Sequence, residues 1–187
     1  MPTNKTLMVV ADYIRNNTVI NKDVDSELIE PFIVSAQNVR IESILGTGLF
    51  NDIITNINNT TIAGNNKTLL DDYIQPCLIQ WVVYEALPFI NYKLTNKSVS
   101  TQDSDNSTHS QLNEVQYLRE NVRNTAEYMS QRLTDYLKSN TTLFPLYINP
   151  GNDCDTIRPN SSNYFNGIYL EGNDDCNYGL GLGIDLN

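Results

Sequence analysis

The sequence contains little of what enzymes and metal proteins usually need. It has a single histidine, His109, which lies in a strongly polar stretch and is predicted to be a solvated loop residue rather than a member of a catalytic triad. Its three cysteines, Cys77, Cys154 and Cys176, are odd in number and far apart. They form neither a disulfide framework nor the C-x2-C pairs of structural zinc sites. We therefore predict no metal, no other cofactor and a reducing compartment.

Basic charge is also scarce. Lys and Arg number 12 against 22 Asp and Glu, which gives a formal net charge of -10 and an isoelectric point near 4.4. No overall basic field exists to hold nucleic acid by its phosphates, so ordinary DNA or RNA binding is disfavoured. An acidic surface remains compatible with a channel through which DNA slides without sticking, because like charges repel.

Long apolar runs are missing as well. The N-terminal stretch MPTNKTLMVVADYI has too short an apolar run for a secretory signal, and no stretch approaches the roughly 20 apolar residues of a membrane span. The sequence therefore predicts a soluble protein made in a cytoplasm, with no membrane partner.

Several short patterns imitate functional motifs without completing them. Asp103, Asp105 and Ser107 resemble the opening of a calcium loop, but a threonine replaces its glycine and its closing glutamate is missing. The glycines of YGLGLGID lack the GK[ST] ending of a phosphate loop. Asp71 and Asp72 fall in the first turn of an expected helix, where acids interact favourably with the helix dipole. We expect no catalytic residues, and Trp81 among Ile, Val and Leu is expected in the core.

Apolar periodicity predicts a mainly α-helical chain. Residues 1–24 are an N-terminal segment of open structural type, and a helix follows from the caps Asp25 and Ser26 to about residue 45, with Pro31 bending its first turn. A short amphipathic helix covers residues 49–57.

The next helix is expected to be central and buried. Its cap is predicted at Thr68, with a kink at Pro76 and an end at Pro88. The fourth helix, Gln111 to Lys138, has the clearest pattern of the chain. Its apolar seam is interrupted only by Arg119 and consists of Leu112, Val115, Val122, Ala126, Met129, Leu133 and Tyr136. At 1.5 Å per residue this helix spans roughly 42 Å, so we expect part of it to pack on another subunit.

Two segments lack a helical pattern of apolar residues. Residues 91–110 are too long and polar for a simple turn and are expected to project towards a neighbour, with a loose β-hairpin as one form. Residues 141–187 combine glycine and proline with scattered aromatic residues, which favours an extended arm that orders on a partner. The resulting domain plan is a helical domain over residues 25–140, built as a bundle of about four helices, followed by this arm.

The order of these segments resembles the small head-to-tail connector, or adaptor, proteins of tailed bacteriophages. The resemblance is carried by SELIEPFIVSAQNVRIESILGTGLFNDI, LDDYIQPCLIQWVVYEALPFI, the loop YKLTNKSV and EYMSQRLTDYLKSNTTLFPLY, which together cover roughly residues 25–147. The Asn-rich style and the long aromatic tail look most like versions from crAss-like phages. The resemblance implies a bundle of about four helices in a ring of usually about twelve subunits beneath the portal protein.

The same resemblance implies partners and a location. These are further copies of the chain, the portal protein and neighbouring ring or tail proteins of a virion assembled in a bacterial cytoplasm, with packaged DNA passing through without sequence-specific binding. The projecting loop and the arm would make the contacts. The residues expected at these contacts are Leu94, Val99, Phe144, Tyr147, Tyr164, Phe165 and Tyr169.

Two other classes of function are weighed against the connector ring. A monomeric helical adaptor module that binds a peptide or protein would leave the apolar seam of the fourth helix satisfied within the chain. A hydrolase or metal-dependent enzyme built on the acidic tail is strongly disfavoured, because the sequence lacks a matching set of catalytic or ligating residues.

Overall fold

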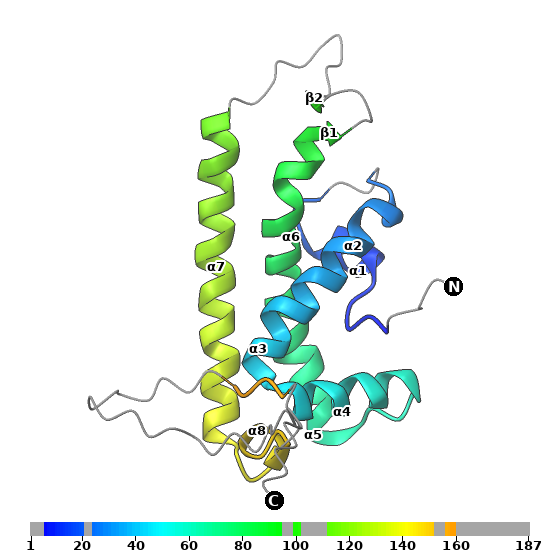
Figure 1. Ribbon diagram of the computed structural model, residues 1–187, viewed down its shortest axis with the longest axis vertical. Helices are drawn as coiled ribbons and strands as arrows, with labels where there is room; N and C mark the ends of the chain where they lie inside the picture. Colours follow the sequence, from blue (N-terminus) through cyan, green and yellow to red (C-terminus); the bar gives the residue numbers. More distant parts are fainter. Residues whose placement is uncertain (1–5, 21–23, 95–98, 102–111, 152–155, 160–187) are drawn as a thin grey trace, which may run out of the picture.

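The computed structural model describes residues 6–20, 24–94, 99–101, 112–151 and 156–159, and over these residues the chain is mainly helical (Figure 1). Side chains of residues 90–94, 99–101 and 112–114 are outside the description. The elements in chain order are α1 Ala11–Asn17, α2 Ser26–Ala36, η1 Gln37–Ile41, α3 Glu42–Leu45, α4 Thr47–Asn58, α5 Gly64–Leu69, η2 Leu70–Ile74, α6 Gln75–Asn91, β1 Tyr92–Leu94, β2 Val99–Thr101, α7 Leu112–Ser139 and α8 Pro145–Ile148.

The predicted helix over residues 25–45 is confirmed as one continuous run of α2, η1 and α3. Pro31 lies inside α2 without ending it, since a single missing N–H near the start of a helix removes only one bond. The η1 turn is π-helical, with the Glu42 N–H donating to the Gln37 carbonyl five residues earlier. Gly46 ends the run because its positive φ of 76° suits glycine.

The central helix starts earlier and ends later than the sequence indicates. It begins at Gly64 rather than at a Thr68 cap, and it passes through Pro88 to end at Asn91. The predicted irregularity near Pro76 takes the form of the π-helical η2 immediately before it, where the Gln75 N–H donates to the Leu70 carbonyl. Proline has no N–H, so the chain already lacks one α-helical bond at this point, and a wider turn costs less here.

Helix α7 lies antiparallel to α6, the α2–α3 run crosses in front of α6, and α4, α5 and α8 close one end (Figure 1). The predicted fourth helix is confirmed to within one residue at each end. Its seam packs inside this chain: Val115, Ala126 and Leu133 are buried, and Val122, Met129 and Tyr136 pack against the core.

The length of α7 is matched by its partner within the chain. The buried positions run from Val115 to Leu137, and the surface that they cover consists of η2, with 5 residues, and α6, with 17. At 1.5 Å per residue, each side of this contact measures roughly 33 Å. The length of α7 therefore does not by itself require a second subunit, and the expectation that part of α7 packs on one stays a prediction.

The N-terminal segment belongs to the helical core rather than preceding it. Met8, Val9, Ile14 and Ile20 are buried in the same hydrophobic cluster as the long helices. Gln37 holds the segment in place, because its Oε1 accepts the Met8 N–H at 2.9 Å and its Nε2 donates to the Thr6 carbonyl at 3.2 Å. The boundary predicted at residue 25 is therefore corrected, since residues 8–20 fold with the domain.

The start of the expected C-terminal arm is also part of the core. Phe144 and Tyr147 are buried, and the ring of Phe144 lies 6.0 Å from that of Tyr136 on α7. Farther along, the Thr47 N–H donates to the Ile157 carbonyl at 3.0 Å. A boundary at residue 140 is therefore wrong, because the chain folds back onto α4 and α7 after α7 ends.

The expected projecting loop contains a short antiparallel pair directly after α6. Strands β1 and β2 pair with Leu94 opposite Val99 and Tyr92 opposite Thr101. Residues 95–98 and 102–111 between and beyond these strands lie outside the described residues. The two strands place the paired backbone at the end of the molecule away from α8 (Figure 1).

Candidate interaction surfaces

The predicted contact residues have three different outcomes. Phe144 and Tyr147 are 1% and 8% exposed, so they cannot reach a neighbour from this conformation, and their assignment as interface anchors is corrected. Burial also raises the pKa of the Tyr147 hydroxyl. Leu94 and Val99 pair through their backbones in the β1–β2 strands. The other three predicted anchors, Tyr164, Phe165 and Tyr169, lie outside the described residues.

Cys77 and Trp81 are core residues of α6, and both contact the hydroxyl of Ser130 on α7. The Trp81 Nε1 donates to the Ser130 Oγ at 2.9 Å, and the Cys77 Sγ lies 3.3 Å from the same oxygen. Ser130 in turn donates to the Ala126 carbonyl of its own helix at 2.8 Å. Burial raises the pKa of the Cys77 thiol to about 11, so the reactive thiolate is disfavoured. The prediction that Trp81 is a core residue is confirmed.

Among the described residues, none of the other motif-like patterns in the sequence forms a reactive centre. Asp71 and Asp72 are exposed and lie seven and eight residues after the start of α5, so the dipole interpretation is wrong for them. Asp71 instead pairs with Lys67 at 4.0 Å. His109, Cys154, Cys176 and the glycine series near the C-terminus lie outside the described residues, as do Asp103, Asp105 and Ser107.

The described part of the chain shows neither a metal-binding cluster nor a membrane-spanning helix. No group of three or more His, Cys, Asp or Glu side chains there is placed to bind a metal ion. No helix in that part combines the length and the apolar character needed to cross a membrane.

Two arginines stack on neighbouring aromatic rings of α6. The guanidinium of Arg40, from η1, lies 4.3 Å from the centroid of the Trp81 ring, and that of Arg119, from α7, lies 4.2 Å from the Tyr84 ring. The two rings meet edge to face at 5.5 Å. Each stack holds a positive charge against an electron-rich ring face, so this part of α6 fixes two positive charges between two other helices. Arg123, one turn beyond Arg119, completes what we call the arginine cluster: Arg40, Arg119 and Arg123.

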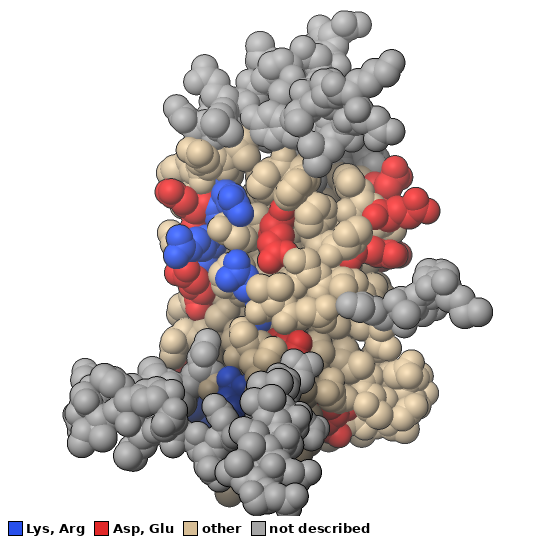
Figure 2. Space-filling model, in the orientation of Figure 1, with Lys and Arg blue, Asp and Glu red and all other residues tan. Residues whose placement is uncertain are grey.

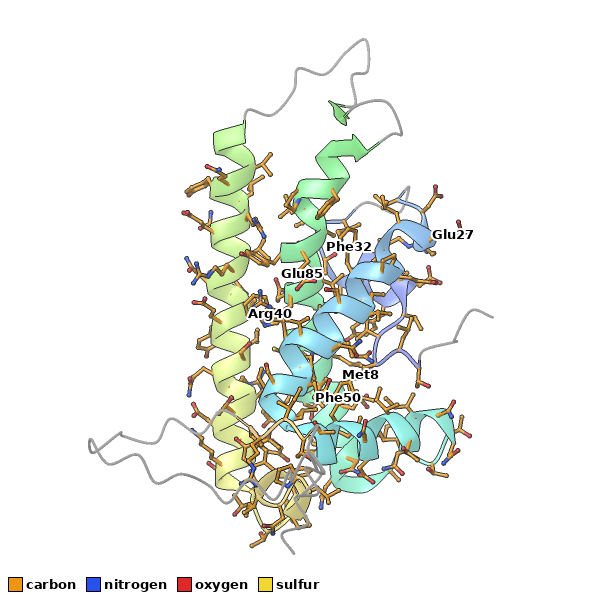
Figure 3. All side chains as sticks on the ribbon, viewed as in Figure 1. Met8, Glu27, Phe32, Arg40, Phe50 and Glu85 are labelled. Atoms are coloured by element: carbon orange, nitrogen blue, oxygen red, sulfur yellow. The ribbon has the colours of Figure 1, made fainter. Side chains whose placement is uncertain are left out.

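The charges of the arginine cluster are only partly compensated. The Arg40 Nε lies 3.8 Å from the Glu85 Oε1, which is too long for a hydrogen bond, and the two side chains face each other between α7 and α2 (Figure 3). The Nε atoms of Arg40 and Arg119 are buried without a hydrogen-bond partner. Arg123 pairs with Glu127 at 2.7 Å on the exposed side of α7. Glu120, on the same helix, also acts on Arg123, so the three arginines have three glutamates nearby. The Nε atoms of Arg40 and Arg119 nevertheless remain without a hydrogen bond.

Acidic side chains gather at a different place. On the face drawn in Figure 2, basic side chains lie among acidic ones on the side along which α7 runs, whereas the opposite edge carries only acidic ones among the charged side chains of the described residues. The first turns of α2 contribute exposed Asp25, Glu27 and Glu30, which we call the acidic end. No described residue forms an ion pair with any of these three carboxylates. Glu27 marks this edge in Figure 3.

The outer face of α7 carries exposed aromatic residues. Tyr117 and Tyr128 are 66% and 68% exposed, and their spacing of eleven residues puts them on one face, three turns apart. Asn121 and Asn124 lie between them and are also exposed. Tyrosines with uncharged amides form a stripe rich in contact area, which is typical of protein interfaces, and exposed charged residues such as Glu120 and Glu127 flank it.

Sequence reasoning missed the arginine cluster, although one signal pointed to it. Arg119 interrupts an otherwise apolar seam, which indicates an arginine that faces inward and therefore has a partner there. The identity of that partner, Tyr84, depends on how α6 and α7 are aligned, and spacing along one helix cannot supply that alignment.

The comparisons with known proteins give a family but no function. Residues 41–157 match a family of unknown function, DUF6712, and because the match covers more than half of the chain, the chain belongs to this family. No curated protein and no solved structure matches it.

Proposed function

We propose that this member of DUF6712 is a non-enzymatic structural protein of a tailed-phage virion that forms a ring at the head-to-tail junction. In this role it links the portal protein to tail components and surrounds the passage for DNA. The resemblance of residues 25–147 to phage connector proteins supports the proposal, and the match over residues 41–157 lies mostly within that range.

The exposed face of α7 is the observation that carries the proposal. Tyr117 and Tyr128 offer large, stiff side chains at low entropic cost, and they lie on the helix that forms one side of the molecule (Figure 1). Neighbouring subunits that cover this side of the molecule would remove both tyrosine rings from water. Repetition around a closed ring makes such contacts strong together even where each is weak.

The finer architecture is part of the same proposal. The long helical runs α2–α3, α5–α6 and α7, together with α4, act as a connector bundle of about four helices. The loop over residues 91–110 extends from one end of this bundle and reaches a neighbouring protein, as does the chain beyond residue 159. Tyr164, Phe165 and Tyr169 remain the proposed anchors in that C-terminal part.

A monomeric helical adaptor module is the second candidate, and one observation favours it. The seam of α7 is satisfied against α6 and η2 within a single chain, which is what a monomeric module requires. The two candidates therefore differ in what covers the opposite face of α7. In the adaptor, this face of α7 contacts a single partner protein that is not a copy of this chain. In the ring, it contacts the neighbouring subunits.

The mass of the purified full-length protein in solution tests the proposal. Light scattering at several concentrations, with and without the co-expressed portal protein of the same phage, is expected to give a ring-sized species or a monomer that assembles only on the portal. The variant Tyr117→Ser with Tyr128→Ser should lower that assembly, while Thr125→Ala, on an exposed position of the same helix, serves as the matched control.

Two other outcomes would contradict different parts of the proposal. A protein that stays monomeric at every concentration and ignores the portal contradicts the ring and favours the adaptor. Assembly that is unaffected by the tyrosine variant would keep the ring but remove the α7 face from its contacts.

A further inference from the structure

We propose that the acidic end of one copy, Asp25, Glu27 and Glu30, docks on the arginine cluster of the next copy, Arg40 and Arg119 with Arg123. This inference rests on the proposed function, because it adds two charged surfaces to the contacts that join neighbouring subunits of the ring. The occupant of the arginine cluster is thus a second copy of this chain.

The arginine cluster is built to accept carboxylates. Stacking on Trp81 and Tyr84 fixes the guanidinium groups of Arg40 and Arg119 in place, so little side-chain entropy remains to be lost when a partner binds. Burial has removed water from both Nε atoms without supplying a hydrogen bond, so these cations are less well solvated than free arginine. Arg40 is nevertheless still 39% exposed, which leaves access for an incoming carboxylate.

The acidic end has the complementary properties. Its three carboxylates are exposed, lie within six residues and form no ion pair with a described residue. Leu28, in the same turn, is 46% exposed and adds an apolar contact. The positive end of the α2 dipole stabilises these acids in the free chain, but that interaction satisfies only part of their charge.

The two surfaces cannot satisfy each other within one molecule. Glu27 and Arg40 are thirteen residues apart on the continuous α2–η1 run, which at 1.5 Å per residue separates them by roughly 20 Å. Glu27 lies at one edge of the molecule, and Arg40 faces α7 (Figure 3). Two complementary surfaces at different places on a subunit give a head-to-tail contact, which generates a closed ring or an open filament instead of a twofold dimer.

A charge exchange between two full-length variants tests the contact. The first variant, Glu27→Lys with Glu30→Lys, has two positive surfaces, and the second, Arg119→Glu with Arg123→Glu, has two negative ones. Each alone should require at least about tenfold more protein to assemble, under the condition that assembles the wild type, because like charges meet at every junction. An equal mixture should restore assembly, since alternating subunits then pair opposite charges.

Matched controls separate this contact from general charge and folding effects. Asp71→Lys with Asp72→Lys changes the net charge by the same amount as the first variant at exposed positions elsewhere and should assemble as the wild type does. The fluorescence of Trp81, the only tryptophan, reports whether each variant is folded. Should Arg119→Glu disturb the fold, the two single variants Glu27→Lys and Arg123→Glu repeat the exchange at exposed positions.

The outcomes distinguish this inference from the proposed function. Loss in each variant and recovery in the mixture support it. The contact is overturned, while the ring itself stands, if either variant alone assembles as the wild type does. It is also overturned if the two variants are folded and their mixture still does not assemble. A wild-type chain that never assembles, with or without portal, overturns the ring and this contact together.

Discussion

Replacing Ser130 by alanine tests how α7 is held to the central helix. The Ser130 Oγ accepts a hydrogen bond from the Trp81 indole at 2.9 Å and lies 3.3 Å from the Cys77 Sγ, so one atom satisfies two side chains of α6. Trp81 is only 6% exposed, and water cannot easily replace the lost oxygen without opening the helix contact.

The expected loss follows from two opposing effects. An indole N–H left buried without a partner costs about 1–3 kcal/mol. Alanine favours the helix over serine by about 0.5 kcal/mol, which offsets part of this cost. The free energy of unfolding should therefore fall by about 0.5–2.5 kcal/mol.

Denaturant unfolding followed by Trp81 emission measures the change and also reports on the indole itself. The control Thr125→Ala removes a hydroxyl that bonds only to the Asn121 carbonyl of its own helix on an exposed face, and it should leave stability within about 0.5 kcal/mol of the wild type. Combining Ser130→Ala with Trp81→Phe, followed by circular dichroism, should give a coupling energy of about 1 kcal/mol. Equal stability of Ser130→Ala and Thr125→Ala, with no coupling, would refute the reasoning.

Three further predictions concern the core and its edges. With the other two cysteines replaced by serine, Cys77 should resist thiol reagents at pH 8 in the folded protein and react on unfolding, and rapid labelling of the folded chain at pH 8 would contradict its burial. Because its pKa is raised from 9.0 to about 11, the contribution of Cys77 to stability is complete below pH 9 and is lost as the pH rises through 11. Gly48→Ala would place a Cβ 2.6 Å from the Pro150 carbonyl oxygen, so limited proteolysis should cut the chain near residue 150 faster. Thr125→Ala, at an exposed position of α7, should not change cleavage there. Gln37→Leu leaves the Met8 N–H without its acceptor and should lower stability by about 1–3 kcal/mol, and undiminished hydrogen-exchange protection at residue 8 would show that this bond does not hold the segment.

Local pattern was a good guide where one helix face decides the structure. The apolar seam predicts α7 to within one residue at each end, because each position on a helix face repeats with a period near 3.6 residues whatever it packs against. The same logic succeeded for residues 25–45 and for the burial of Trp81. Helix boundaries near proline were less certain: a proline removes one bond, and surrounding contacts decide whether the helix continues, as α6 does through Pro88.

The sequence by itself therefore determined the mainly helical class, the two long runs at residues 26–45 and 112–139, and the acidic character of the chain. Only the tertiary structure decided which surfaces those helices cover. The length of α7 alone suggested a second subunit, but η2 and α6 cover its buried positions from Val115 to Leu137 within the chain. The aromatic side chains of Phe144 and Tyr147 suggested an arm, whereas the chain folds back onto α7 and buries them. The physical reason is that helical period is a property of neighbouring residues, whereas burial depends on segments that are distant along the chain and meet only in the folded molecule.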